Sequence, residues 1–140
     1  MTDTPKKKFE GEIFTVDFDG TCTKHRFPDL GDDIGAAPVL RRIVEEGGKI
    51  ILWTMRSGKH LDGPIEWYKK NNIPLWAVNK NPQQHHWTSS PKAFSHYHID
   101  DTNVAGPVIF DTKDERGINR YYVDWEKIAT ALGIPDAFEK

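Results

Sequence analysis

Short apolar runs alternate with amphipathic segments along most of the chain. Between residues 38 and 46, apolar side chains recur at the spacing of one helix face, and two glycines follow. The run from Lys49 to Trp53 is almost continuously apolar, which is typical of a strand buried on both faces. These criteria predict strands at 13–16, 49–53, 75–78 and 96–99, and helices at 38–46, 65–71 and 125–132.

The order of these elements predicts the architecture. Strands that alternate with helices indicate right-handed parallel βαβ units and a sheet covered on both faces. We therefore expect an α/β, Rossmann-like three-layer fold with a mostly parallel central sheet. Residues 1–11 are polar and lysine-rich and are expected to form a flexible arm, followed by a single domain over 12–140. The segment 104–123 is ambiguous, because two parts of it, 108–110 and 120–123, could each be a strand.

Composition limits the classes of protein that the chain can represent. Its 140 residues suffice for one domain with a buried core, and 37% of them are apolar. The formal net charge of −2 provides no strong general field for nucleic acid or an anionic membrane. A membrane partner is therefore not expected, and a nucleic-acid partner is not indicated but stays open.

The single cysteine, Cys22, excludes an internal disulfide and fits a reducing compartment, so we expect a cytoplasmic protein. Cys22 has no evident base partner and is expected to be a packed small residue rather than a nucleophile. No apolar run approaches the ~20 residues of a membrane helix. The first residues carry lysines with no apolar segment after them, so we expect no secretory signal.

Polar side chains follow three of the predicted strands at the point where each strand ends. Asp17 and Asp19 follow the first, Thr54 follows the second, and Asp100-Asp101 follow the fourth. Because the carboxyl ends of parallel strands meet at one edge of a sheet, four carboxylates would crowd one crevice. Like charges at close range require a cation or protonation. Mg²⁺ suits a set of carboxylate and carbonyl oxygens better than zinc does.

This set of residues predicts phosphoryl chemistry. A carboxylate beside Mg²⁺ can attack phosphorus and form an acyl phosphate, which water then hydrolyses. The attack needs a second acid for the leaving alcohol, a hydroxyl for the phosphoryl oxygens, and a cation for their remaining charge. Asp19, Thr54 and Lys92 are residues of these three types.

Three stretches of the sequence resemble the motifs of one enzyme family. VDFDGT (16–21) matches the first motif of the haloacid dehalogenase-like (HAD) hydrolases. ILWT (51–54) resembles their second motif, an apolar strand that ends in Ser or Thr. Lys92 followed by YHIDD (97–101) resembles their third and fourth motifs. The resemblance covers residues 12–105 and implies a Rossmann-like fold and Mg²⁺-dependent phosphoryl transfer.

The resemblance also implies roles for single residues. Asp17 would be the nucleophile, and Asp19 would be the general acid and base. The metal would be held by Asp17, the backbone carbonyl of Asp19, and Asp100. Asp101 would either complete the metal shell through water or orient Lys92.

Several of these assignments have rivals within the sequence. Lys80, just after the third predicted strand, competes with Lys92. Lys92 is preferred because it lies just before the strand of the fourth motif, as in compact members of the family. Thr54 could equally cap the next segment, and Arg56 could equally form a structural ion pair.

Four residues near these strand ends are candidates for substrate contact: Gly20, His25, Arg26 and Arg56. Gly20 lets the chain turn away after the first strand. For His25 and Arg26, in the loop that follows, a solvated position competes with contact to a leaving group. Zinc at the histidines of 85–98 is disfavoured, because no cysteine cluster or third ligand at helical spacing supports it.

Together these features predict a Mg²⁺-dependent phosphomonoester hydrolase that acts through a phospho-aspartyl intermediate on Asp17. Its partner would be a phosphorylated substrate, small or macromolecular. The alternatives are a phosphatase of nucleic-acid ends or protein phosphosites, a phosphotransferase, and a non-catalytic binding module with the HAD fold. Neither 21–54 nor 54–92 is long enough to hold a cap domain, so we expect a capless phosphatase shielded by loops 22–35 and 79–91. The oligomeric state stays open.

Overall fold

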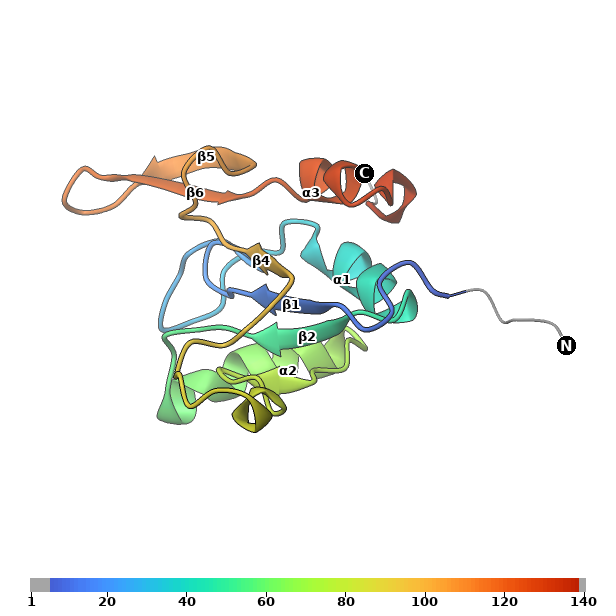
Figure 1. The fold of residues 1–140 in the computed structure, drawn as a ribbon. Coiled ribbons are helices and arrows are strands. Elements are labelled where there is room, and N and C mark those ends of the chain that lie inside the picture. The colour runs from blue at the N-terminus through green and yellow to red at the C-terminus, as the bar shows by residue number, and fades with distance from the viewer. Residues whose placement is uncertain (1–5, 139–140) are drawn as a thin grey trace, which may run out of the picture.

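Four parallel strands form the central sheet of the computed structural model, which describes residues 6–138 (Figure 1). They are β1 (Ile13–Val16), β2 (Lys49–Leu52), β3 (Ala77–Val78) and β4 (Tyr97–Ile99). Their order along the sheet is β3-β2-β1-β4. Val16 pairs with both Leu52 and Ile99, so the carboxyl ends of β1, β2 and β4 lie level with one another.

Three α-helices share a core with one face of this sheet. α1 (Ala36–Glu45) and α2 (Asp62–Lys70) connect β1 to β2 and β2 to β3, and α3 (Trp125–Ala131) follows later in the chain. Both connections step in the same direction along the sheet, so right-handed crossovers place α1 and α2 on one face. The predicted α/β, Rossmann-like fold is confirmed.

The other face of the sheet is covered by the loop between β3 and β4. The regular structure in this loop is one 3₁₀ turn, η2 (Gln84–His86). Ser95 of the loop bonds Thr15 of β1, with 2.9 Å between the hydroxyl oxygens. The buried Gln84 amide makes three hydrogen bonds to the backbone of residues 90–94. The third layer of the predicted fold is therefore a loop held by a side chain.

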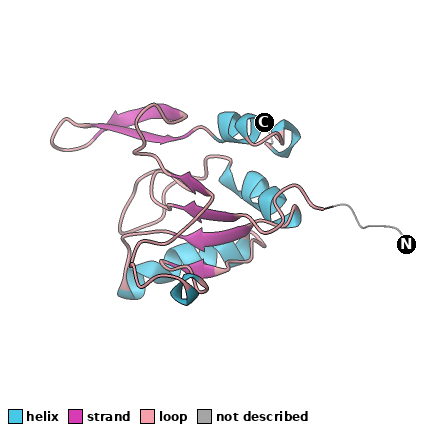
Figure 2. Ribbon diagram, in the orientation of Figure 1, coloured by secondary structure: helices cyan, strands magenta, loops and turns pink. Residues whose placement is uncertain are grey.

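The ambiguous segment 104–123 forms an antiparallel hairpin apart from the central sheet (Figure 2). Its strands are β5 (Val108–Lys113) and β6 (Asn119–Val123). The Val123 N–H donates to the Gly20 carbonyl over 3.0 Å. The hairpin therefore borders the loop that follows the predicted nucleophile.

Two predicted boundaries shift in the structure. Phe9 is buried in the core and its N–H donates to the Glu46 carbonyl (2.8 Å), so the folded domain begins before residue 12. Residues 1–5 of the predicted arm lie outside the described part of the chain. The third strand is shorter than predicted and begins at Ala77.

The chain between the predicted motifs holds no inserted cap. Besides the helices and strands above, the intervals 21–54 and 54–92 contain loops, η1 (Gly58–Leu61) and η2. The last 3₁₀ turn, η3 (Pro135–Ala137), packs beside α3. Within residues 6–138, no helix combines the length and apolar character needed to cross a membrane.

Candidate active site

An acidic cluster lies at the carboxyl edge of the sheet, where β1 and β4 end side by side. The Asp17 N–H donates to the Ile99 carbonyl over 3.0 Å, which extends the pairing of the two strands by one residue. One carboxylate oxygen each from Asp17, Asp100 and Asp101 lie within 4.8 Å of one another. The strand ends thus bring together three of the four predicted carboxylates.

The electrostatics of the cluster favour a bound cation. Burial, together with the charges of Asp100 and Asp101, raises the pKa of Asp17 from 3.8 to about 8, against a hydrogen bond from Thr21. Burial also acts to raise the pKa of Asp100, but hydrogen bonds from His98, Asp101 and Thr102 outweigh it and hold that pKa below its ordinary value. Without a cation, the cluster therefore retains a proton near neutral pH.

Asp101 is held by a histidine. His25 Nε2 lies 2.7 Å from Asp101 Oδ2, and both side chains approach the backbone at Gly20. Gly20 has a φ of +78°, and a Cβ at this position would collide with His25 Nε2 and Asp101 Oδ2. His25 therefore lies inside the site rather than in a solvated loop. Of the two roles expected for Asp101, a pairing with Lys92 is not seen, because no lysine among residues 6–138 pairs with this carboxylate.

Asp19 is not part of this cluster, and its carboxylate pairs with Arg56 instead. Arg56 Nε and Nη2 donate to the two Asp19 oxygens over 2.8 and 2.7 Å. The remaining N–H groups of this buried guanidinium donate to the carbonyls of Pro28, Asp29 and His60. All five donors are thus used within the chain, which favours the ion-pair alternative for Arg56 over substrate contact.

Arg26, the remaining candidate for substrate contact, lies on the surface. Its Nη2 is 3.7 Å from Asp32 Oδ1, and both side chains are mostly exposed. Nothing in the described structure directs Arg26 toward the acidic cluster.

Thr54 lies just beyond β2, beside the loop that follows β3. Its N–H donates to Asn79 Oδ1 (2.8 Å), and its Oγ1 accepts from the Arg56 N–H (3.1 Å). These bonds stabilise the turn, as one alternative predicted. The hydroxyl hydrogen of Thr54 is not used in them and can donate to a phosphoryl oxygen.

The two candidate lysines line different hollows. Lys92 lines a cavity of about 790 Å³ on the loop-covered face of the sheet, together with Thr15, Trp53 and His98. Lys80 lines a hollow of about 250 Å³ within the loop itself. Among residues 6–138, neither ammonium has a hydrogen-bond or ion-pair partner. The cavity of Lys92 reaches β1, β4 and the end of β2, whereas the hollow of Lys80 stays within the loop, and neither lining includes a residue of the acidic cluster.

Sequence reasoning missed two residues of the site. The Thr21 hydroxyl donates to Asp17 Oδ2 over 3.0 Å. His98 Nδ1 lies 2.7 Å from Thr15 Oγ1, and His98 Nε2 lies 3.3 Å from Asp100 Oδ2. A signal was available for His98, because a residue two positions before Asp100 on a strand shares its face.

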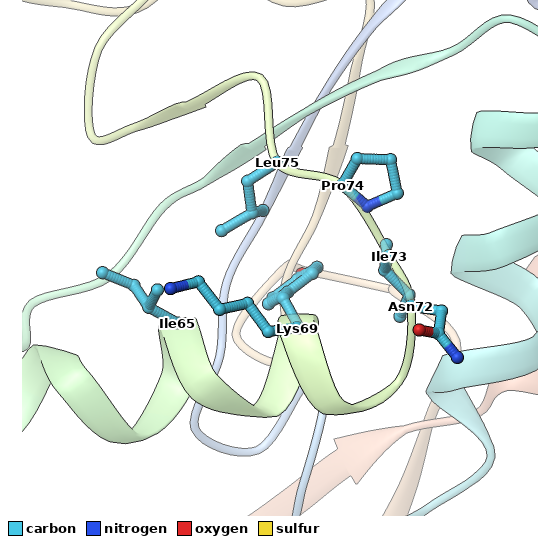
Figure 3. Close-up of a pocket in the computed structure, with 7 residues that line it drawn as sticks. Ile65, Lys69, Asn72, Ile73, Pro74 and Leu75 are labelled. Atoms are coloured by element: carbon cyan, nitrogen blue, oxygen red, sulfur yellow. The ribbon is translucent and has the colours of Figure 1, made fainter.

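A further hollow differs from the acidic cluster in the chemistry of its lining. It measures about 560 Å³ and lies between α2 and the segment 72–75 (Figure 3). Its lining is mainly apolar, with Lys69 as the charged side chain, and it contains none of the predicted site residues. The acidic cluster is therefore the better candidate for an active site.

Comparison with known proteins places the chain in a family. A solved structure of a conserved protein from Bacteroides thetaiotaomicron shares 38% sequence identity with it, over 68% of this chain and 79% of that one. The chain belongs to the family of that protein. The TM-score between the two is 0.62, which supports the α/β architecture. No protein-family model and no curated protein matches the chain.

Proposed function

We propose that this protein is a Mg²⁺-dependent phosphomonoester hydrolase of the HAD type. The observation that carries the proposal is the cluster of Asp17, Asp100 and Asp101, with oxygens within 4.8 Å of one another. Burial and the two neighbouring charges raise the pKa of Asp17 to about 8, so a cation would relieve a strong repulsion. Three carboxylates are hard oxygen ligands of the kind that Mg²⁺ prefers.

Asp17 is the proposed nucleophile, and Thr21 orients it. Mg²⁺, held by Asp17, Asp100, Asp101 and the Asp19 carbonyl, would supply positive charge for the phosphoryl oxygens. An Asp17 oxygen forms a bond to phosphorus while the bond from phosphorus to the leaving oxygen breaks. Water then attacks phosphorus, which releases inorganic phosphate and restores the Asp17 carboxylate.

Asp19 is the proposed general acid and base. It gives a proton to the leaving oxygen in the first step and takes one from the attacking water in the second. Its ion pair with Arg56 suits the carboxylate form that accepts the proton from water. Proton donation requires this pair to loosen. The Thr54 hydroxyl and the Lys92 ammonium bind non-bridging oxygens of the phosphoryl group while Asp17 attacks its phosphorus.

The test is hydrolysis of 4-nitrophenyl phosphate with and without Mg²⁺. Asp17→Asn keeps the size of the side chain and removes the nucleophile, so kcat should fall at least about 10³-fold. Asp32→Asn, at a side chain that is 68% exposed, is the matched control and should retain wild-type kcat. Turnover that persists in purified Asp17→Asn, or after complete chelation of the metal, would contradict the mechanism.

A second measurement separates hydrolysis from transfer. The wild-type enzyme is assayed with an added alcohol, and the phosphoryl products are quantified. A hydrolase releases inorganic phosphate in step with the leaving alcohol. Accumulation of the phosphorylated acceptor instead would assign the protein as a phosphotransferase.

A further inference from the structure

A hollow of about 300 Å³ lies against Asp19, where the loop after β1 meets the loop after β2. Its lining residues come from both loops: Asp19, Phe27, Met55, Arg56, Ser57 and His60. Of the described hollows, this one contains the proposed general acid. A leaving oxygen must approach that acid, so the hollow is placed to receive the leaving group.

Arg56 makes hydrogen bonds to both of the loops that form the hollow. Its guanidinium donates to the carbonyls of Pro28 and Asp29 in the loop after β1, over 2.9 and 2.8 Å. It also donates to the His60 carbonyl in the other wall, over 3.2 Å. A buried guanidinium with every donor used holds both loops in one arrangement. The hollow is therefore preformed.

The surface that this hollow offers to a ligand is mainly apolar. Phe27 is 59% exposed and Met55 is 99% exposed, although both side chains are large and apolar. The Phe27 ring also contacts the other lining residues, because its centroid lies 5.1 Å from that of the His60 ring and 5.0 Å from the Arg56 guanidinium. Exposed apolar side chains gathered at the mouth of a hollow mark a binding surface.

We propose that this hollow is the leaving-group subsite and that the substrates are phosphomonoesters whose alcohol carries a flat aromatic ring. The proposal rests on the proposed function, because Asp19 must reach the leaving oxygen. The ring would stack on Phe27 and contact Met55. Arg56 offers no free donor to a polyhydroxylated alcohol. Beside Asp19, the polar side chains left in the lining are Ser57 and His60, which are too few to match several hydroxyl groups.

The test compares 2-phenylethyl phosphate with glycerol 1-phosphate. Both are primary alkyl esters, so the aromatic compound has no advantage from a better leaving oxygen. The wild-type enzyme should have the higher kcat/KM on 2-phenylethyl phosphate. Phe27→Ala should lower that value about 10-fold and Met55→Ala about threefold, with glycerol 1-phosphate unchanged within about twofold.

Two other aromatic residues serve as comparisons. Phe110→Ala makes the same change at a ring that is 53% exposed on the β5–β6 hairpin. It should leave kcat/KM unchanged for both substrates. Trp87→Ala removes an exposed aromatic side chain from the cavity that Lys92 lines. A selective loss in Trp87→Ala but not in Phe27→Ala would place the leaving group in that other cavity. An unchanged ratio in Phe27→Ala would equally overturn the subsite.

A binding measurement separates failure of the subsite from failure of the phosphatase proposal. Calorimetry with 3-phenylpropyl phosphonate, which cannot be hydrolysed, is carried out with Mg²⁺ on the wild type and Phe27→Ala. Affinity should fall about 10-fold in Phe27→Ala. Equal affinities would overturn the subsite even if both esters are hydrolysed. Absence of turnover on both esters and on 4-nitrophenyl phosphate, with affinity that still depends on Phe27, would contradict the phosphatase and show only that the hollow binds an aromatic ring.

Discussion

Single carboxylates in this protein differ in what balances their charge. Asp17, Asp100 and Asp101 face one another, whereas Asp19 has the Arg56 guanidinium at 2.7 Å. Among residues 6–138, no lysine or arginine pairs with the first three, of which Asp100 and Asp101 have histidine neighbours, whereas a guanidinium compensates the fourth. This difference separates a proposed metal-binding role from a proposed proton-transfer role.

The raised pKa of Asp17 predicts a pH-dependent cost in stability. Burial and two acidic neighbours raise it to about 8 in the folded state, so the folded protein holds this proton more tightly than the unfolded chain. The resulting stabilisation is complete below the ordinary value of 3.8 and is lost as pH rises through about 8. Asp17→Asn should therefore be more stable than the wild type at pH 8.5, by about 2 kcal/mol.

This prediction is tested by urea unfolding of chelator-treated protein between pH 5 and pH 8.5. The wild type should lose stability across this range more steeply than Asp17→Asn. Asp100 does not interfere, because its lowered pKa keeps it ionised throughout. Asp32→Asn is the control and should follow the wild-type curve of stability against pH. Parallel curves for the wild type and Asp17→Asn would show that Asp17 does not cause the loss of stability.

Replacing Arg56 should destabilise the fold. Arg56→Ala leaves Asp19 unbalanced and frees three loop carbonyls, so the free energy of unfolding should fall by about 3–5 kcal/mol. Arg56→Lys should recover part of this loss, because the positive charge is kept. The recovery should be incomplete, because an ammonium cannot make the bidentate contact of a guanidinium. Arg26→Ala breaks an exposed pair and should cost less than about 1 kcal/mol. Thermal melts of the variants measure these losses of stability. Equal losses in Arg56→Ala and Arg26→Ala would contradict the structural role of Arg56.

The two lysines can be separated by kinetics. Lys92→Ala should lower kcat/KM for 4-nitrophenyl phosphate about 10²-fold, because its ammonium has no partner among residues 6–138 and lines a cavity that reaches Trp53, the residue after β2. Lys80 lines a separate hollow, so kcat/KM of Lys80→Ala should stay within about twofold of the wild-type value. A larger loss in Lys80→Ala would reassign the phosphate-binding lysine.

Among the elements, the loop between β3 and β4 is unusual because it replaces a helix as the cover of one sheet face. Loops have backbone groups that need partners when they are buried. Asn81 and Gln84 supply these partners through their amides, to the backbone N–H groups of Gln83 and Gln84 and to residues 90–94. Two polar side chains therefore supply hydrogen bonds to the loop backbone that a helix would make between its own backbone groups.

Gln84→Ala should release this loop. The substitution removes three hydrogen bonds to the loop backbone, so amide exchange over residues 88–95 should accelerate, and unfolding should become easier by about 2–3 kcal/mol. Gln83→Ala changes the neighbouring, exposed side chain and should leave exchange in the loop unchanged. Unaltered protection in Gln84→Ala would show that other contacts hold the loop.

At the scale of the whole molecule, the C-terminal part of the chain completes the core near the site. Trp125 of α3 is buried, and its Nε1 donates to the Thr21 carbonyl over 2.7 Å. Thr21 in turn donates to Asp17. A direct chain of contacts thus connects α3 to the proposed nucleophile.

Truncation after Gly106 should prevent folding. It removes β6 and α3 with Val123, Trp125 and Ala129 from the core, and the loss of one such Trp alone costs about 3–5 kcal/mol. A chain in which Asn-Gly replaces 111–120 keeps α3 and joins the paired residues Phe110 and Tyr121, so it should fold. Far-UV and near-UV circular dichroism distinguish the outcomes. A cooperative melt of the truncated chain would contradict the prediction.

Much of the fold follows from local pattern. Apolar alternation and turn residues predicted β1, α1, β2, α2, β4 and α3 close to their observed bounds, because each element buries one face or one run of its own sequence. The β5–β6 hairpin stayed ambiguous, since its strands expose Ile109 and Phe110 and lack a clear buried face. The burial of Phe9 was missed because it depends on contact with distant parts of the chain.

The candidate site shows the same division. Residue types and spacing suffice to place Asp17, Asp100 and Asp101 at one edge of a parallel sheet, because strand polarity sets which ends meet. Their sequence positions do not show that Asp101 pairs with His25, that Asp19 pairs with Arg56, or that His98 bridges toward Asp100. These partners come from different elements. Which side chain occupies the space beside a carboxylate depends on how the loops pack, and tertiary structure alone decides that.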